Sequence, residues 1–250
     1  MESGVDRSTK NELARPPKTS RENRPFKIWK SATRNSTSRG ERVDRQKEPE
    51  LMTNAPSVFS PLVERAMRVA ARGHREQTRK ASDLPYLTHP ASVALLLTKS
   101  GIIDDEILAA ALLHDVVEDT DCSLEALATE FPPRVIEFVA ALTERKRDDA
   151  GQKRSWQDRK TEHLEHVAAS SWEARAITLA DKLHNLGTMA FDLETDPDLW
   201  SRFNAPPERL LWYYREMIAA ASQGESRLRM LAEECSKLVE HLATRMPAAN

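Results

Sequence analysis

Apolar residues recur three or four positions apart along most of the chain after residue 60, the spacing that places side chains on one face of an α-helix. The first such series runs through Leu62, Ala66 and Val69, and Ser60-Pro61 before it fits a helix N-cap and first turn. No alternating run typical of a β-strand and no internal repeat is present. The same periodicity predicts helices over residues 60–73, 90–99, 104–119, 123–131, 133–142, 172–190, 207–217 and about 225–245. The pattern therefore predicts an all-α fold with one helical domain over residues 55–245.

The first 50 residues lack this periodicity and differ in charge. They carry 13 Lys or Arg and 8 Asp or Glu, a net charge of +5, whereas the remaining 200 carry 24 and 31, a net of −7. No apolar h-region follows the basic residues, so we expect no signal peptide. We predict a disordered basic tail over residues 1–54, or a wrongly assigned start with Met52 as the true initiator.

Composition excludes several classes of protein. No apolar run approaches the roughly 18 residues that cross a bilayer. Cys122 and Cys235 are the two cysteines of the chain and match no zinc or redox spacing, so we expect a cytoplasmic protein. The net charge of −2 and the absence of a membrane segment make nucleic acid and membranes unlikely partners.

The stretch ALLHDVVEDT (111–120) places four titratable side chains directly after core-forming residues. His114, Asp115, Glu118 and Asp119 are of types rarely buried unless they pair or bind a metal. In a helix His114 would align with Glu118, and Asp115 with Glu118 and Asp119. An adjacent His-Asp pair can offer one nitrogen and one oxygen to a divalent ion, and such mixed ligation suits Mn, Fe or Zn rather than Ca. The simpler interpretation is a solvated helix face with ordinary ion pairs.

Two other residues are candidates to complete a metal site. His89 lies in PYLTHP (85–90), at the start of an apolar helix. Asp181 lies in ITLADKLHNL (177–186), where an unpaired aspartate on an apolar helical face would be unfavourable. With His114 and Asp115 they would supply two imidazoles and two carboxylates, although Asp181 could instead pair with Lys182.

Four motifs in order now carry a family resemblance. HREQTRK (74–80), PYLTHP (85–90), AALLHDVVEDT (110–120) and LADKLHNL (179–186) resemble the HD-domain superfamily of metal-dependent phosphohydrolases. More narrowly, the chain resembles the (p)ppGpp hydrolase domain of RelA/SpoT proteins and the small stand-alone alarmone hydrolases, which WSRFNAPPERLLWYYREM (200–217) also resembles. The length leaves no room for the other regions of the long RelA/SpoT enzymes, so we expect a hydrolase only.

The resemblance implies an activity and a role for each matching residue. One Mn²⁺ ion per site would be held by His89, His114, Asp115 and Asp181, with Glu118 and Asp119 activating the attacking water. The nucleotide ppGpp or pppGpp would lose its 3′-pyrophosphate to give GDP or GTP. The implied substrate contacts are Arg79 near the guanine, Lys80, Asn185, and the basic residues Lys153, Arg159 and Lys160 facing the phosphates.

One departure from the family keeps alternatives open. The family often has an arginine within two residues after LADKLHN, where this chain has Leu186-Gly187-Thr188. Loss of a cationic contact there would affect substrate preference, so a related phosphohydrolase acting on another nucleotide, such as NADPH, is one alternative. A non-catalytic module that binds the alarmone is a second, against which the intact Glu118-Asp119 pair argues.

Overall fold

The computed structural model describes residues 58–79, 83–144, 151–152 and 154–247. Its α-helices and two 3₁₀ turns confirm the predicted all-α class, and an isolated antiparallel bridge between Thr78 and Pro85 is the one β pairing within these ranges. The predicted tail over residues 1–54 and the candidates Lys80 and Lys153 lie outside the described residues. In chain order the elements are α1 (Pro61–Gly73), α2 (Thr88–Lys99), α3 (Asp105–Leu113), α4 (Val116–Asp119), α5 (Leu124–Ala128), α6 (Pro133–Leu142), α7 (Trp156–Ala169), α8 (Trp172–Asp192), η1 (Leu199–Arg202), α9 (Pro207–Ser222), η2 (Ser226–Leu228) and α10 (Arg229–Ala243).

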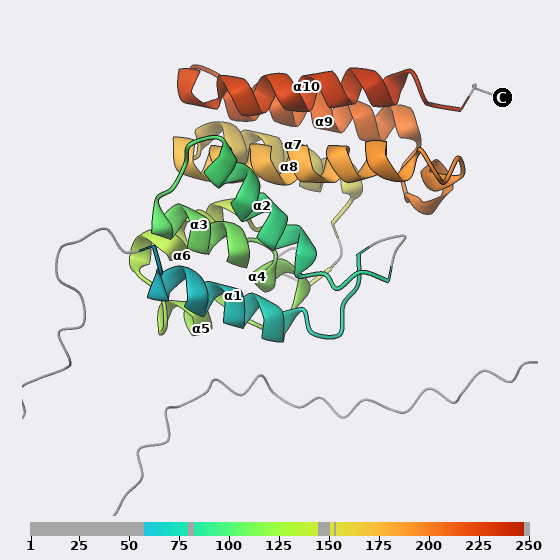
Figure 1. The fold of residues 1–250 in the computed structure, drawn as a ribbon. Coiled ribbons are helices and arrows are strands. Elements are labelled where there is room, and N and C mark those ends of the chain that lie inside the picture. The colour runs from blue at the N-terminus through green and yellow to red at the C-terminus, as the bar shows by residue number, and fades with distance from the viewer. Residues whose placement is uncertain (1–57, 80–82, 145–150, 153, 248–250) are drawn as a thin grey trace, which may run out of the picture.

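The helices form a stack with α8 at its centre (Figure 1). α9 and α10 lie on one side of α8, and α2, α3 and α6 lie on the other, with α1 and α5 outermost. α8 is the longest helix of the described residues and packs against α2, α3, α6, α7, α9 and α10. A polar residue on α8 can therefore meet side chains from both halves of the bundle.

Local sequence explains why α3 begins where it does and packs so closely. The Asp104 side chain accepts hydrogen bonds from the backbone N–H groups of Glu106 and Ile107, which caps the helix. Ala109, Ala110 and Ala111 are fully buried, and their small side chains allow the neighbouring helices α1, α2, α6 and α8 to approach.

The predicted single helix over residues 104–119 was wrong, because the chain breaks at His114–Asp115. α3 ends at Leu113, and the short helix α4 begins at Val116. The cause is a side-chain hydrogen bond: His114 Nδ1 lies 2.7 Å from the Ala111 carbonyl oxygen, one of the last carbonyls of α3, which lack an intrahelical donor. The polar cluster therefore lies at a junction of two helices.

The predicted boundary near His89 was also wrong, by two residues. PYLTHP makes a turn and enters α2 at Thr88, so His89 lies in the first helical turn. The Thr88 hydroxyl and the His89 backbone N–H donate to the carbonyls of Pro85 and Tyr86, respectively. Pro90 is tolerated there because the first N–H groups of a helix have no intrahelical acceptor.

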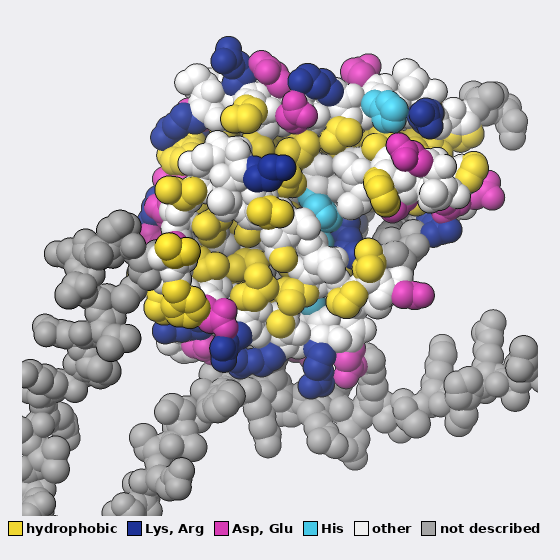
Figure 2. All heavy atoms as spheres, in the orientation of Figure 1, with side chains coloured by type: hydrophobic (Ala, Val, Ile, Leu, Met, Phe, Trp, Pro, Cys, Tyr) yellow, Lys and Arg dark blue, Asp and Glu magenta, His cyan; other side chains and the backbone are white. Residues whose placement is uncertain are grey.

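One face of the molecule is apolar over α1, α2 and α3, with charged side chains along its upper and lower edges (Figure 2). Exposed apolar side chains include Phe59, Leu95 and Ile103. None of the described helices is both long and apolar enough to cross a bilayer.

Leu112→Ala should destabilise the domain by about 2–5 kcal/mol, because it leaves a cavity in the centre of the bundle. Leu112 is 1% exposed on α3, whereas Leu95 on α2 is 59% exposed. Leu95→Ala is the matched control and should change the free energy of unfolding by less than about 0.5 kcal/mol. Urea denaturation followed by circular dichroism measures both, and equal effects would contradict the position of α3.

Candidate functional site

Two imidazoles and two carboxylates meet where α2, α3 and α8 come together. His89 Nε2 lies 3.1 Å from Asp181 Oδ1 and 3.5 Å from Asp115 Oδ2. His114 Nε2 lies 3.0 Å from Asp115 Oδ2 and 3.9 Å from Asp181 Oδ1. The structure thus brings together all four residues predicted as metal ligands.

Both histidines are oriented by a contact at their Nδ1 atoms. His114 Nδ1 lies 2.7 Å from the Ala111 carbonyl, which requires Nδ1–H to donate there and directs Nε2 towards the carboxylates. His89 Nδ1 lies 2.8 Å from Nδ1 of His184, one turn beyond Asp181 on α8. Each Nε2 therefore faces the carboxylates.

Both carboxylates are also held by donors other than the histidines. The Tyr86 hydroxyl donates to Asp115 Oδ2 at 2.6 Å. Asn185 Nδ2 donates to Asp181 Oδ1 at 2.6 Å, and Lys182 Nζ lies 2.5 Å from Asp181 Oδ2. Such outer partners fix the orientation of ligating groups and are typical of metal sites.

The electrostatics of the cluster favour ionised carboxylates. Burial tends to raise the pKa of Asp181, but Lys182 and the two histidines outweigh it and hold that pKa well below its ordinary value. The pKa of Asp115 is likewise lowered, because His114 outweighs the effect of burial. Burial lowers the pKa of His114, yet Asp115 and Asp181 raise it to about 9. Two anionic carboxylates sharing a site with two imidazoles attract a cation.

The donor set fits a divalent metal ion. His89, His114 and Asp115 each offer an atom within 4.8 Å of the others, and Asp181 Oδ1 lies within 3.9 Å of both histidines. His114 Nε2 is buried and, although it lies 3.0 Å from Asp115 Oδ2, it makes no hydrogen bond of normal geometry to the described residues, as expected of an atom that binds a metal. Mixed nitrogen and oxygen ligation suits Mn, Fe or Zn, and does not choose among them.

The cluster forms one wall of a cavity of about 190 Å³. Its other walls bring in Glu118 from α4, Lys160 from α7 and Tyr213 from α9. Glu118 is half-buried, whereas Asp119 is exposed and is not among the described residues that line the cavity. Of the two acids predicted to act on the water, Glu118 therefore lines the cavity and Asp119 does not.

A second cavity of about 360 Å³ adjoins the first, because Arg79, Tyr86 and Asn185 line both. Arg79 Nη2 donates to Asn185 Oδ1 at 2.8 Å, and the guanidinium carbon of Arg79 lies 5.6 Å from the centre of the Tyr86 ring. Two residues predicted to contact substrate therefore stand together at the boundary between the cavities.

The basic residues at the start of α7 are already paired. Arg159 and Lys160 both contact the carboxylate of Glu144, which follows α6, and Lys160 Nζ lies 2.5 Å from Glu144 Oε2. Lys160 lines the smaller cavity, and Arg159 is not among the described residues that do.

Gly187 faces away from both cavities. A Cβ atom built there would lie 3.9 Å from Leu238 Cδ1 on α10. The position is not among the described residues that line either cavity. The glycine therefore removes no side chain from the cavity wall, which weakens the argument from sequence for a different substrate.

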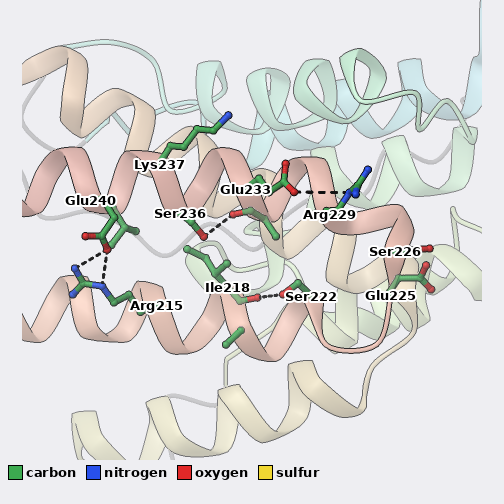
Figure 3. A pocket seen from close by; sticks show the side chains of 13 residues that line it. Arg215, Ile218, Ser222, Glu225, Ser226, Arg229, Glu233, Ser236, Lys237 and Glu240 are labelled. Atoms are coloured by element: carbon green, nitrogen blue, oxygen red, sulfur yellow. Dashed lines mark hydrogen bonds and ion pairs between the residues drawn. The ribbon is translucent and has the colours of Figure 1, made fainter.

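A larger hollow lies on the far side of α8, between α9 and α10, with a volume of about 770 Å³ (Figure 3). Arg215 pairs with Glu240 across it and Arg229 pairs with Glu233 along α10. None of the four clustered residues lines this hollow. We therefore take the cluster between α2, α3 and α8 as the candidate functional site.

The sequence of this chain is similar to those of known proteins over the region that contains the site. The family model for the HD domain matches residues 66–200, more than half of the chain and all four clustered residues. The chain belongs to the HD-domain family. The guanosine-3′,5′-bis(diphosphate) 3′-pyrophosphohydrolase MESH1 of Homo sapiens is 36% identical over 170 residues, 67% of this chain and 87% of that protein. The corresponding protein of Drosophila melanogaster is 41% identical over 131 residues, 52% of this chain and 70% of that protein.

A solved structure of a related HD-domain protein has the same fold. It is a metazoan orthologue of SpoT that hydrolyses ppGpp, and it matches with a TM-score of 0.62 and 29% identity over 75% of this chain and 98% of that chain. The resemblance predicted from the motifs is therefore confirmed.

Several residues at this HD-domain site were missed from the sequence. Tyr86 stood inside a motif that had been noted, directly after Pro85 and three positions before His89. Glu144 gave a weaker signal, an acid between an apolar helix and a run of charges. Lys182 had been considered only as a partner that would remove Asp181 from the site, whereas the structure shows Asp181 contacting both Lys182 and His89.

Tyr86→Phe should weaken divalent-metal binding about tenfold or more, since it removes the hydroxyl that donates to Asp115. Titration calorimetry with Mn²⁺ measures the dissociation constant. Tyr214→Phe is the control, because the Tyr214 hydroxyl donates to none of the four clustered residues. An unchanged constant in Tyr86→Phe would show that the Tyr86 hydroxyl does not support metal binding through Asp115.

Proposed function

We propose that the protein is a Mn²⁺-dependent hydrolase that removes the 3′-pyrophosphate of ppGpp or pppGpp, giving GDP or GTP and pyrophosphate. The observation that carries the proposal is the buried two-histidine, two-carboxylate cluster, which opens into a cavity that also holds Glu118 and a lysine. The MESH1 relatives, named for this activity, support it. The free and buried Cys122 and Cys235 fit the predicted cytoplasmic location.

His89, His114, Asp115 and Asp181 would hold the Mn²⁺ ion. When bound there, the ion supplies Lewis acidity and positive charge to the reacting phosphate. The identity of the ion as manganese rests on the family resemblance, since these ligand types also accept iron or zinc.

Glu118 is the group that we assign to the attacking water. Its carboxylate lies on the cavity wall, where it can orient the water and accept a proton as the bond between the 3′ oxygen and the pyrophosphate breaks. Asp119, one residue further along α4, would support this step through its charge; burial and Asp115 raise the pKa of the Tyr86 phenol, and Asp119 adds to them.

The larger of the two adjoining cavities is the place that we assign to the nucleoside. Arg79 and Phe203 offer a planar cation and an aromatic ring, both of which can stack on a purine. The smaller cavity would then receive the pyrophosphate, with Lys160 and Lys182 on its walls. Asn185, hydrogen-bonded to both Asp181 and Arg79, connects the two ends of the site.

Purified protein with Mn²⁺ should release pyrophosphate from ppGpp, and removal of the metal by a chelator should stop the reaction until Mn²⁺ is restored. His114→Ala and Asp115→Ala should each reduce the rate to that of buffer alone. Liquid chromatography of the nucleotide products provides the readout. Full activity in either variant would exclude the cluster as the reacting centre.

Glu118→Gln should lower kcat by about a hundredfold or more, because it removes the proposed proton acceptor while keeping the side-chain shape. Asp119→Asn should have the smaller effect, since Asp119 is exposed and off the cavity wall. Steady-state kinetics of both variants at saturating Mn²⁺ measures the difference. The reverse order would transfer the role of base to Asp119.

Two assays separate the alternatives. NADPH offered beside ppGpp distinguishes a hydrolase for another nucleotide, and we expect ppGpp to be the faster substrate. Tight ppGpp binding without product over hours would identify a binding module in place of an enzyme.

A further inference from the structure

Glu144 is a buried acid that none of the roles assigned so far explains. Among the described residues, Glu144 and Asp181 are the only buried acidic residues. Asp181 belongs to the histidine cluster, whereas Glu144 lies outside the family motifs, directly after α6. A buried carboxylate is strongly unfavourable unless cations and hydrogen bonds surround it, so its partners should reveal its role.

The partners of Glu144 link it to both sides of the reaction site. Its carboxylate oxygens contact Arg159 and Lys160, with Lys160 Nζ at 2.5 Å from Oε2. Its backbone N–H donates to Glu118 Oε2 at 3.2 Å. Glu144 thus holds two groups of the same cavity wall in place, Glu118 through its backbone and Lys160 through its carboxylate.

Lys160 needs such a partner to remain an ammonium ion. Its side chain is 19% exposed, and Nζ lies 4.7 Å from the centre of the Tyr213 ring. Burial and the charge of Lys182 lower the pKa of Lys160, and Glu144 is the main group that opposes them. The groups that face Lys160 come from α4, the segment after α6, α8, α9 and its own helix, and they are Glu118, Glu144, Lys182, Tyr213, Arg159 and His163.

His163 shows how strongly this part of the cavity disfavours additional positive charge. Burial, together with Lys182 and Lys160, lowers the pKa of His163 to about 4, so the imidazole is neutral near pH 7. Burial and nearby positive charge would likewise lower the pKa of a lysine on this wall that had no anionic neighbour. Only the charged form of a lysine attracts phosphate effectively.

We infer that Glu144 is a positioning residue that keeps Lys160 charged and aimed into the cavity, where Lys160 binds the pyrophosphate group. The inference rests on the proposed function for the identity of the substrate. Glu144 acts through Lys160 and has no contact with the reacting atoms. When a phosphate enters, Lys160 can keep Glu144 as a neighbour, because an ammonium group has three donors.

Glu144→Gln is the direct test, because it removes the charge and keeps the shape. At about pH 9, where loss of the Glu144 charge should reduce the charged fraction of Lys160 more than at pH 7, we expect the variant to have a KM for ppGpp about tenfold above that of the unmodified protein. Near pH 7 the difference should be smaller. Glu137→Gln is the matched control, because Glu137 is an exposed acid on α6, and its KM should follow the unmodified protein at both pH values.

Glu144→Gln combined with Lys160→Arg provides a rescue. An arginine stays charged at every pH used, so the double variant should regain a low KM at about pH 9. A purely structural role of Glu144 predicts no such recovery. A KM in Glu144→Gln equal to that of the unmodified protein at both pH values, or a double variant no better than Glu144→Gln, would overturn the inference.

A binding measurement separates this inference from the proposed function. Titration calorimetry with inorganic pyrophosphate should give a weaker dissociation constant for Glu144→Gln at about pH 9, by a similar factor. Weaker pyrophosphate binding in a protein that leaves ppGpp intact would refute the proposed activity and retain the role of Glu144. If the protein hydrolyses ppGpp but Glu144→Gln binds pyrophosphate as tightly as the unmodified protein, the proposed activity stands and the role of Glu144 is refuted. If Glu144→Gln does not fold, as judged by circular dichroism, Glu144→Asp repeats the test with the carboxylate withdrawn by one methylene group, and the same outcomes decide.

Discussion

The buried charge of Asp181 is the constraint on which the arrangement of the site depends. An aspartate in the middle of the central helix cannot remain ionised without compensation, because transfer of a carboxylate from water to the protein interior is opposed by several kcal/mol. Lys182, Asn185 and His89 provide that compensation from α8 itself and from α2. The contact between α2 and α8 therefore stabilises the buried charge of Asp181 and, at the same time, brings His89 into the site.

The same reasoning explains the break between α3 and α4. A continuous helix would leave the Ala111 carbonyl to a backbone donor and would free the His114 ring to rotate. By taking that carbonyl, His114 ends α3, fixes its own ring and presents Nε2 to the carboxylates. The small buried alanines before it let the junction lie close to α8, so that a local interruption of the helix becomes part of the site.

Much of this could be predicted from the sequence, and the reasons for the failures are physical. Helix periodicity and capping residues such as Ser60 predicted most helices, and the composition of the ALLHDVVEDT stretch identified half of the cluster. The break after Leu113 could not be predicted, because it depends on a side-chain hydrogen bond that competes with a backbone one. Gly187 was assigned to the cavity from its place in a motif, whereas the rotation of α8 directs it towards α10. Glu144 was missed because its burial is set by α7, whose approach no local pattern records.

The central claim is that the four clustered residues form one metal site. A crystal of the protein grown with Mn²⁺ and measured at a wavelength where manganese scatters anomalously tests it most directly. The account predicts one strong anomalous peak bonded to His89, His114, Asp115 and Asp181, with His114 Nε2 among its ligands. A peak bound elsewhere, for instance at the exposed Asp119, with the cluster still held by its own hydrogen bonds, would contradict it.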